Sequence, residues 1–212
     1  MKREFKDLIR MESYKNLNSE ITGDYDKTNA VKCINGTFVG TEENGVTSWL
    51  GIPYAKPPVG ERRFKAPEYV DAKDGVFEAK YYGKGAYGSN GYPCIQKLES
   101  EDCLYLNIWV NEDDKTEKKP VMVWIHGGAY VVGSGSQASY SGANLVQKQS
   151  DIIMLTINYR LNMYGFMDFS SVPGGESFGT APCNGLLDQA MALRWVHENI
   201  AAFGGDPDNV TI

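Results

Sequence analysis

The first regular pattern of apolar residues along the chain has the spacing of β-strands. The runs VKCINGTFVG (31–40) and VTSWLGI (46–52) contain many β-branched and aromatic residues, which favour strands. Asn44-Gly45 lies between them, and this dipeptide is a strong signal for a tight turn between antiparallel strands. The pattern therefore predicts an N-terminal β-hairpin.

The residues before this point have a different character. Residues 1–30 are polar and charged, and we expect them to form an N-terminal extension outside the core. Residues 31–212 would then form a single domain, which is the ordinary expectation for a chain of 212 residues.

The continuous apolar run 121–125 has the pattern of a strand that is buried on both faces of a parallel sheet, and residues 152–159 repeat this buried-strand pattern. A third segment, 103–110, alternates enough to form a strand, and residues 143–148 are expected to form a helix. The first apolar run leads directly into HGGAYVVGSGS (126–136). This succession of strands and helices indicates the α/β class.

The strongest helical pattern begins near Asn184, which is a good N-cap residue. Its apolar positions recur at helical spacing and are expected to face the core; they are Leu186, Ala190, Leu193, Val196, Ile200 and Phe203. A Gly-Gly pair and Pro207 end the helix, and residues 209–212 begin another strand. Because a domain does not ordinarily end inside a core strand, we expect the fold to continue beyond Ile212.

Composition and charge exclude several classes of function. The net charge is −6 and no basic stripe is present, so we expect neither a nucleic acid partner nor a membrane surface partner. The longest apolar run, 121–125, is far shorter than the roughly 20 residues that a membrane-spanning helix needs. The N-terminus lacks the apolar stretch of a signal peptide, which predicts a cytoplasmic protein.

The residues that bind metals are scarce. The chain has four cysteines and two histidines, and no pair of cysteines has the C-x-x-C spacing of a zinc or redox site. We therefore expect no metal and no cofactor.

The HGG sequence at 126–128 is the most informative local feature. Successive glycines let backbone N–H groups approach a ligand closely, and two such donors can stabilise the oxyanion that forms during acyl transfer. The alternative is a tight glycine turn that performs no chemistry. Three residues alone do not decide between these interpretations.

Two other motifs match familiar patterns in the wrong context. GKGAYG (83–88) fits the dinucleotide-binding pattern G-x-G-x-x-G, but no helix pattern follows it. GESFG (175–179) fits the pattern of a catalytic serine turn, but loop-like residues surround it, so we interpret Ser177 as a loop serine. His126 is expected to brace the glycine turn, and His197 to lie on the outer face of the long helix. The chain thus shows half of an acyl-transfer site.

Read together, these segments resemble the type-B carboxylesterase/cholinesterase family of α/β-hydrolases. The stretches that carry the resemblance are GIPYAKPPVGERRFKAP (51–67), SEDCLYLNIWV (100–110), PVMVWIHGGAY (120–130), TINYRLNMYGF (156–166) and NGLLDQAMALRWVHENIAAFGGDPDNVTI (184–212).

The resemblance implies a fold. The chain would be the N-terminal part of an α/β-hydrolase, with the β-hairpin followed by a mostly parallel sheet with flanking helices. It would end just before the turn that carries the nucleophilic serine. The strand at 152–159 is expected between the strand at 121–125 and the one that begins at Val210.

The resemblance also implies site residues. Gly128 and Ala129 would provide oxyanion-hole N–H groups, with Gly127 giving the turn its freedom, while the serine, acid and histidine would lie beyond residue 212. Two scaffold ion pairs are implied to be buried; they are Arg63 with Glu101 and Arg160 with Asp188. Cys94 and Cys103 occupy the places of the family's first disulfide, but without an export signal we expect free thiols.

The function that follows is hydrolysis of a small-molecule carboxylic ester by a serine carboxylesterase. The loop between Cys94 and Cys103 is short and lacks tryptophan, which favours a general carboxylesterase over a choline esterase. Residues 1–212 alone are expected to be inactive and to need the C-terminal remainder, in cis or as a separate chain. The alternatives are a non-catalytic binding or adhesion relative and a truncated fragment without independent function.

Overall fold

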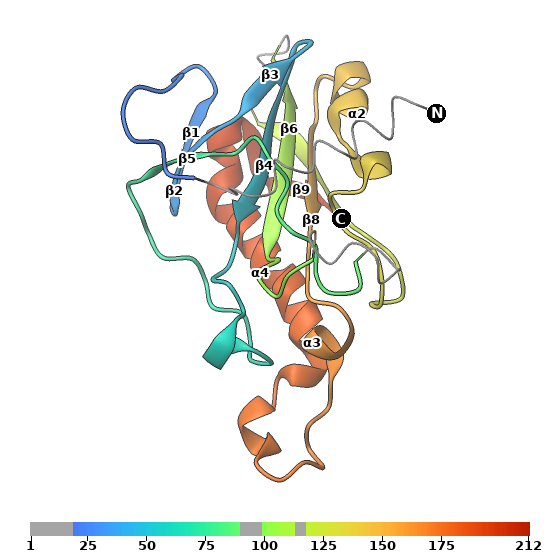
Figure 1. Ribbon diagram of the computed structural model, residues 1–212. Coiled ribbons are helices and arrows are strands. Elements are labelled where there is room, and N and C mark those ends of the chain that lie inside the picture. The colour runs from blue at the N-terminus through green and yellow to red at the C-terminus, as the bar shows by residue number, and fades with distance from the viewer. Residues whose placement is uncertain (1–18, 90–98, 113–117) are drawn as a thin grey trace, which may run out of the picture.

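The computed structural model describes residues 19–89, 99–112 and 118–212 (Figure 1). Its strands are β1 (Ala30–Cys33), β2 (Gly36–Val39), β3 (Thr41–Glu43), β4 (Val46–Pro53), β5 (Val76–Glu78), β6 (Tyr105–Asn111), β7 (Lys119–Ile125), β8 (Ile153–Ile157) and β9 (Gly205–Thr211). Its α-helices within these ranges are α2 (Ala143–Lys148), α3 (Asn162–Phe166) and α4 (Asn184–Asn199).

The N-terminal part forms two hairpins. β1 pairs antiparallel with β2, and β3 pairs antiparallel with β4. Asn44 and Gly45 connect β3 to β4 with φ angles of 55° and 77°, which confirms the predicted turn. The strand before this turn is β3, however, and not the predicted run 31–40, which contains the β1–β2 hairpin. β5 adds to β2 to complete a small three-stranded sheet. Residues 19–21 lie along β5, where the Ile21 N–H donates to the Val76 carbonyl at 2.7 Å.

The larger sheet has the strand order β3-β4-β6-β8-β7-β9. The pairs from β3 to β8 are antiparallel, whereas β8, β7 and β9 are parallel to one another. The α/β class is confirmed, although this portion of the sheet is mixed rather than mostly parallel.

The expected position of the 152–159 strand is wrong. β7, not β8, is the strand in the middle of the parallel part, because Val121 pairs with Ile153 on one side and Val210 on the other. β8 instead fills the place between β7 and the antiparallel strand β6. The crossover through α4 therefore passes over β7 and leaves β9 at the edge of the described sheet.

Helices cover both faces of this sheet (Figure 1). Ala192, Trp195 and Val196 of α4 pack in the main hydrophobic core on one face. Val146 of α2 packs on the other face in a smaller cluster with Val46, Trp109 and Met154. β8 is buried throughout, as its buried-strand pattern predicts. β6 is also buried throughout, although its sequence predicted a strand only from partial alternation.

β7 departs from that prediction. Its inward residues Val121 and Val123 are buried in the main core, but Met122 and Trp124 on the other face are 38% and 40% exposed. α2 covers β4, β6 and β8 on that face, and the Tyr140 ring lies against Trp124 with 5.3 Å between ring centroids. The described residues therefore cover this face of β7 only in part. The uninterrupted apolar run did not distinguish a strand buried on both faces from one buried on a single face.

The predicted apolar stripe of the long helix is confirmed in part, because Val196, Ile200 and Phe203 are buried. Leu186 and Ala190 are exposed, however, whereas the polar residues Asp188 and Asn199 are buried. Asp188 binds Arg160, and the Asn199 side chain accepts a hydrogen bond from the Ile34 N–H at 2.9 Å. Polar residues with long-range partners thus replace apolar ones on the core face, which apolar periodicity cannot detect.

The start of α4 needs a further correction. Asn184 is the first helical residue and the N-cap position belongs to Cys183, so Asn184 is not the cap. Its amide is fully buried, and neither its oxygen nor its nitrogen has a hydrogen-bond partner in the described part of the chain. Burial of an unpaired amide is costly, so Asn184 destabilises the start of the helix unless a group outside the described residues binds it.

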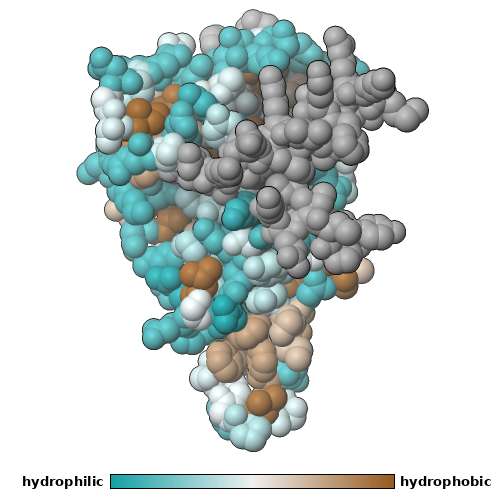
Figure 2. Space-filling view, in the orientation of Figure 1, coloured by the Kyte–Doolittle hydropathy of each residue, from teal (hydrophilic) through white to brown (hydrophobic). Residues whose placement is uncertain are grey.

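The surface is polar over most of the visible face, and apolar groups gather on the lower lobe (Figure 2). This lobe contains α3 and the segment that leads to α4, where Met163, Met167 and Val172 are 42–49% exposed. No helix within the described ranges is long and apolar enough to cross a membrane.

Candidate active site

The turn that follows β7 has an unusual backbone. Gly128, Ala129 and Tyr130 have consecutive positive φ angles of 126°, 54° and 61°. A Cβ at Gly128 would overlap the Val132 carbonyl oxygen, so only glycine fits there. The left-handed conformation costs roughly 1–2 kcal/mol for each non-glycine residue. Such strain persists only where the surroundings hold the backbone, and it is concentrated at functional sites.

The turn is closed from inside by two hydrogen bonds. The N–H groups of Val131 and Val132 both donate to the Gly128 carbonyl, at 2.9 and 3.0 Å. The N–H groups of Gly128 and Ala129 donate to no acceptor among the described residues, and Ala129 is exposed. Two neighbouring backbone donors are therefore available to an acceptor outside the described residues.

Gly127 does not supply the conformational freedom expected of it. It is not among the residues with positive φ, and a Cβ there would meet no atom within 4 Å. The requirement for glycine in this turn lies at Gly128 instead. Gly127 borders open space on the exposed side of the turn.

His126 braces the turn, as the sequence indicated. Its side chain is buried and stacks on the Tyr159 ring, with 4.5 Å between ring centroids. The Tyr159 hydroxyl donates to the His126 carbonyl at 2.8 Å, and His126 Nδ1 lies 2.9 Å from the Gly127 carbonyl oxygen. Burial lowers the pKa of His126, so the neutral imidazole is favoured.

The end of the glycine segment is anchored to β8 and the residues after it. The Asn158 side-chain oxygen accepts hydrogen bonds from the Ser134 hydroxyl at 3.1 Å and from the Gly135 N–H at 2.8 Å. The Thr156 hydroxyl donates to the Gly135 carbonyl at 2.8 Å. Sequence reasoning missed these anchors, although polar residues inside the apolar run 152–159 were a visible signal.

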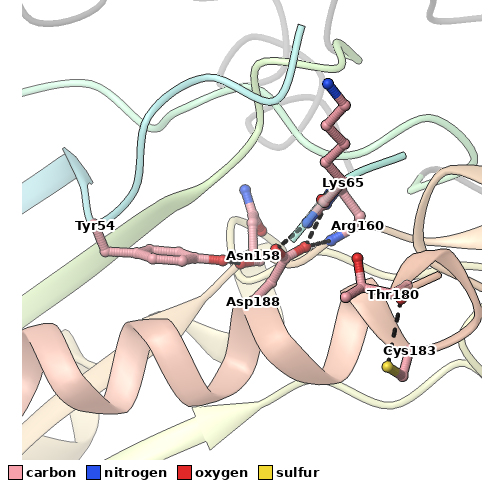
Figure 3. A network of polar contacts seen from close by, with 7 residues as sticks. All are labelled: Tyr54, Lys65, Asn158, Arg160, Thr180, Cys183 and Asp188. Atoms are coloured by element: carbon pink, nitrogen blue, oxygen red, sulfur yellow. Dashed lines mark hydrogen bonds and ion pairs between the residues drawn. The ribbon is translucent and has the colours of Figure 1, made fainter. Parts of the chain in front are cut away.

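Arg160 and Asp188 form the main buried ion pair (Figure 3). Their side chains are 3% and 0% exposed. Arg160 donates to Asp188 from Nη2 at 2.7 Å, from Nε at 2.8 Å and from its backbone N–H at 3.0 Å. A further Arg160 nitrogen, Nη1, donates to the Lys65 carbonyl at 2.7 Å. Burial raises the pKa of Asp188, and the hydrogen bonds from Arg160 oppose that shift.

The pair joins segments that are distant in the sequence. Asp188 belongs to α4 (Figure 3). Arg160 directly follows Tyr159, whose hydroxyl donates to the carbonyl of His126 at the start of the glycine turn. The pair therefore ties the candidate site to the helix behind the sheet.

Arg63 and Glu101 form a bidentate pair with two hydrogen bonds of 2.6 Å. The expectation that this pair is buried is wrong, because the Arg63 side chain is 45% exposed. Water reaches the half-exposed guanidinium and weakens the contribution of the pair to stability, although Glu101 is only 15% exposed.

Of Cys94 and Cys103, which we expect to be free thiols, only Cys103 lies among the described residues. Cys103 is a buried free thiol. Burial raises the pKa of Cys103 well above its ordinary value. Cys33 is also a buried free thiol, while Cys183 is half-buried.

The other candidate groups lie apart from the glycine turn or lack the required context. Ser177 is exposed in a 3₁₀ turn, where its hydroxyl donates to the Gly174 carbonyl at 3.3 Å. His197 is exposed on α4. The G-x-G-x-x-G segment at 83–88 forms no strand–helix junction. Within the described ranges, no group of three potential ligands is placed to hold a metal ion.

Residues 27–212 match the sequence model of the carboxylesterase family. This chain belongs to the carboxylesterase family. The para-nitrobenzyl esterase of Bacillus subtilis is 49% identical over 181 residues, which are 84% of this chain and 36% of that protein. The acetylcholinesterase of Danio rerio is 41% identical over 81% of this chain and 28% of its own length.

Solved carboxylesterase structures agree with this assignment. The crystal structure of a carboxylesterase from Geobacillus stearothermophilus has a TM-score of 0.78 and 48% sequence identity to this chain. It covers 87% of this chain, which in turn covers 37% of that protein. The chain thus spans about a third of the length of the carboxylesterases that it matches.

Proposed function

We propose that this chain is the N-terminal part of a serine carboxylesterase that hydrolyses small-molecule carboxylic esters. Gly128 and Ala129 would donate their backbone N–H groups to the oxyanion that forms when a serine attacks the ester carbonyl. The observation that supports this proposal is the turn after β7, where three consecutive left-handed residues leave two neighbouring N–H groups without an acceptor among the described residues.

The chemistry requires donors that are already in position. Negative charge develops on the carbonyl oxygen as the serine bond forms, and fixed N–H groups stabilise that charge without reorganising. A third donor would come from the residue after the serine. The serine, the acid and the histidine would come from beyond residue 212, either in the same polypeptide or in a separate chain, and no cofactor takes part.

Gly127 has a different role in this proposal from the one the resemblance implied. Because a Cβ at this position would point into open space, glycine leaves room beside the two donors. We assign that room to the substrate carbonyl and the groups attached to it. The acyl and alcohol preferences would depend on residues that follow this chain in sequence.

The first experiment is to read the gene beyond codon 212 and to assay its complete product. We expect a strand–serine–helix turn of the G-E-S-x-G type within a few codons of β9. The complete product should hydrolyse p-nitrophenyl acetate and a p-nitrobenzyl ester, and the Ser177→Ala variant should retain that activity. A different residue in place of the serine would favour a non-catalytic binding relative, and a stop codon would favour a fragment.

A further inference from the structure

Asn162, the first residue of α3, binds the outer side of the glycine turn. Its backbone N–H donates to the Tyr130 carbonyl at 2.9 Å. Its side-chain nitrogen donates to the Val131 carbonyl at 2.8 Å and to the Tyr87 carbonyl at 3.0 Å. Both hydrogens of the amide are therefore used, and they connect the turn to the segment around residue 87.

The backbone of Asn162 is itself left-handed, with a φ of 53°. Asparagine and glycine adopt this conformation more readily than other residues. Glycine would still provide the backbone hydrogen bond to Tyr130, but it would lose both side-chain hydrogen bonds. The left-handed backbone alone would therefore permit glycine here, and the two side-chain hydrogen bonds are what asparagine adds.

The segment opposite Asn162 is shaped around its amide. A Cβ at Gly88 would overlap the Asn162 Nδ2 atom and would lie 2.8 Å from the Val131 carbonyl oxygen. Glycine at position 88 thus leaves the space that the amide occupies between the two segments.

These contacts act on the strained part of the turn. The Tyr130 carbonyl belongs to the peptide plane that directly follows the left-handed residue Tyr130, and the Val131 carbonyl belongs to the next plane. The N–H groups of these same two planes donate to the Gly128 carbonyl, and the peptide of that carbonyl carries the Ala129 N–H. Fixing those planes restricts the torsion angles before them, and these angles determine where the preceding N–H groups point. A donor that is displaced by even about 1 Å loses much of its effect on a transition state.

We propose that Asn162 is a positioning residue, which holds the turn so that the Gly128 and Ala129 N–H groups point at the oxyanion. The inference rests on the proposed esterase function. Asn162 touches neither the substrate nor the reacting atoms, and it acts through the carbonyls of Tyr130 and Val131.

The test compares Asn162→Gly with Asn44→Gly in the complete gene product. Asn44 is a matched control because it also has a left-handed φ, of 55°, and lies in the distant β3–β4 turn. We expect Asn162→Gly to lower kcat for p-nitrophenyl acetate by about tenfold, with KM changed less than about twofold, because the oxyanion is present only in the transition state. Asn44→Gly should leave both constants unchanged.

A second measurement uses a trifluoromethyl ketone, which forms a tetrahedral oxyanion on the serine. Its inhibition constant should rise in Asn162→Gly by the same factor by which kcat falls. Asn162→Asp, which keeps the size of the side chain but donates no hydrogen bond, should show at least as large a change. This variant also serves as the test if Asn162→Gly does not fold.

The outcomes separate the two proposals. An active wild type in which Asn162→Gly and Asn162→Asp behave like Asn44→Gly would overturn the role of Asn162 and leave the esterase function standing. If Asn162→Gly and Asn162→Asp both reduce the amount of folded protein but leave kcat per folded molecule unchanged, Asn162 contributes to stability alone. Absence of hydrolysis and of ketone binding by the wild type would overturn both proposals.

Discussion

Replacing Asp188 with asparagine removes the negative charge that faces the buried Arg160 guanidinium. Both side chains are almost completely inaccessible, so water cannot replace the lost partner. Asparagine keeps one oxygen that can accept from Arg160, but its NH₂ group would face the guanidinium donors. The positive charge would then remain buried without compensation.

The expected cost follows from this geometry. Breaking a buried ion pair by changing one partner costs about 3–5 kcal/mol, which is a large part of the roughly 5–15 kcal/mol that stabilises a typical domain. Arg160→Met combined with Asp188→Asn should be less destabilising than Asp188→Asn alone, because methionine removes the uncompensated charge. The remaining asparagine oxygen can still accept from the backbone N–H of residue 160.

The assay is urea unfolding of the complete gene product, followed by circular dichroism. Glu101→Gln is the control, since its partner Arg63 is half exposed and should give a much smaller loss. A loss below about 1 kcal/mol for Asp188→Asn, in the range of a surface pair, would refute the reasoning. A double variant less stable than the single one would also contradict it.

Three further predictions concern the same scaffold. Burial lowers the pKa of His126, so the unfolded chain binds a proton at this residue more readily than the folded protein does. The free energy of unfolding should therefore fall as pH drops below about 6.5, and His126→Asn should weaken this pH dependence. In the native protein, iodoacetamide should react faster with Cys183 than with the buried Cys103, whereas in urea it should react with both. Equal reaction rates of the two cysteines in the native protein would contradict the burial of Cys103. Residues 1–212 produced alone should self-associate through the edge of β9, which pairs with no further strand among the described residues, and through the partly exposed Met122 and Trp124 of β7. A monomer by analytical ultracentrifugation would contradict this.

The elements that could be predicted from sequence have strong local signals. The Asn44-Gly45 turn follows from the left-handed preference of these residues, and α2 spans the predicted 143–148. The range of α4 follows from its helical spacing and from the Gly-Gly pair after it. The glycine turn after β7 was recognisable as a candidate because glycines directly followed a buried strand.

The features that could not be predicted depend on distant partners. The core face of α4 includes Asp188 and Asn199, whose partners lie 28 and 165 residues away in the sequence. The order of β7 and β8 is decided by which strand pairs with β6, and local periodicity carries no information about that choice.

The same limit applies to the site. Its strained residues, Ala129 and Tyr130, carry no unusual sequence signal, and neither does the amide of Asn162 that contacts the turn. Residues at functional sites often adopt conformations that local sequence preferences do not predict, because the rest of the fold holds these residues in place.

The central claim is that the Ala129 N–H stabilises the oxyanion, and replacing that single N–H tests it most directly. Proline at this position would distort the turn, because its φ near −65° conflicts with the observed 54°. Incorporating L-lactic acid in place of Ala129 exchanges the N–H for an ester oxygen and leaves the side chain unchanged; the same exchange at the exposed Ala138 is the control. We expect the exchange at Ala129 to lower kcat of the complete gene product about 100-fold or more, with KM nearly constant. A kcat equal to that of the control would contradict it.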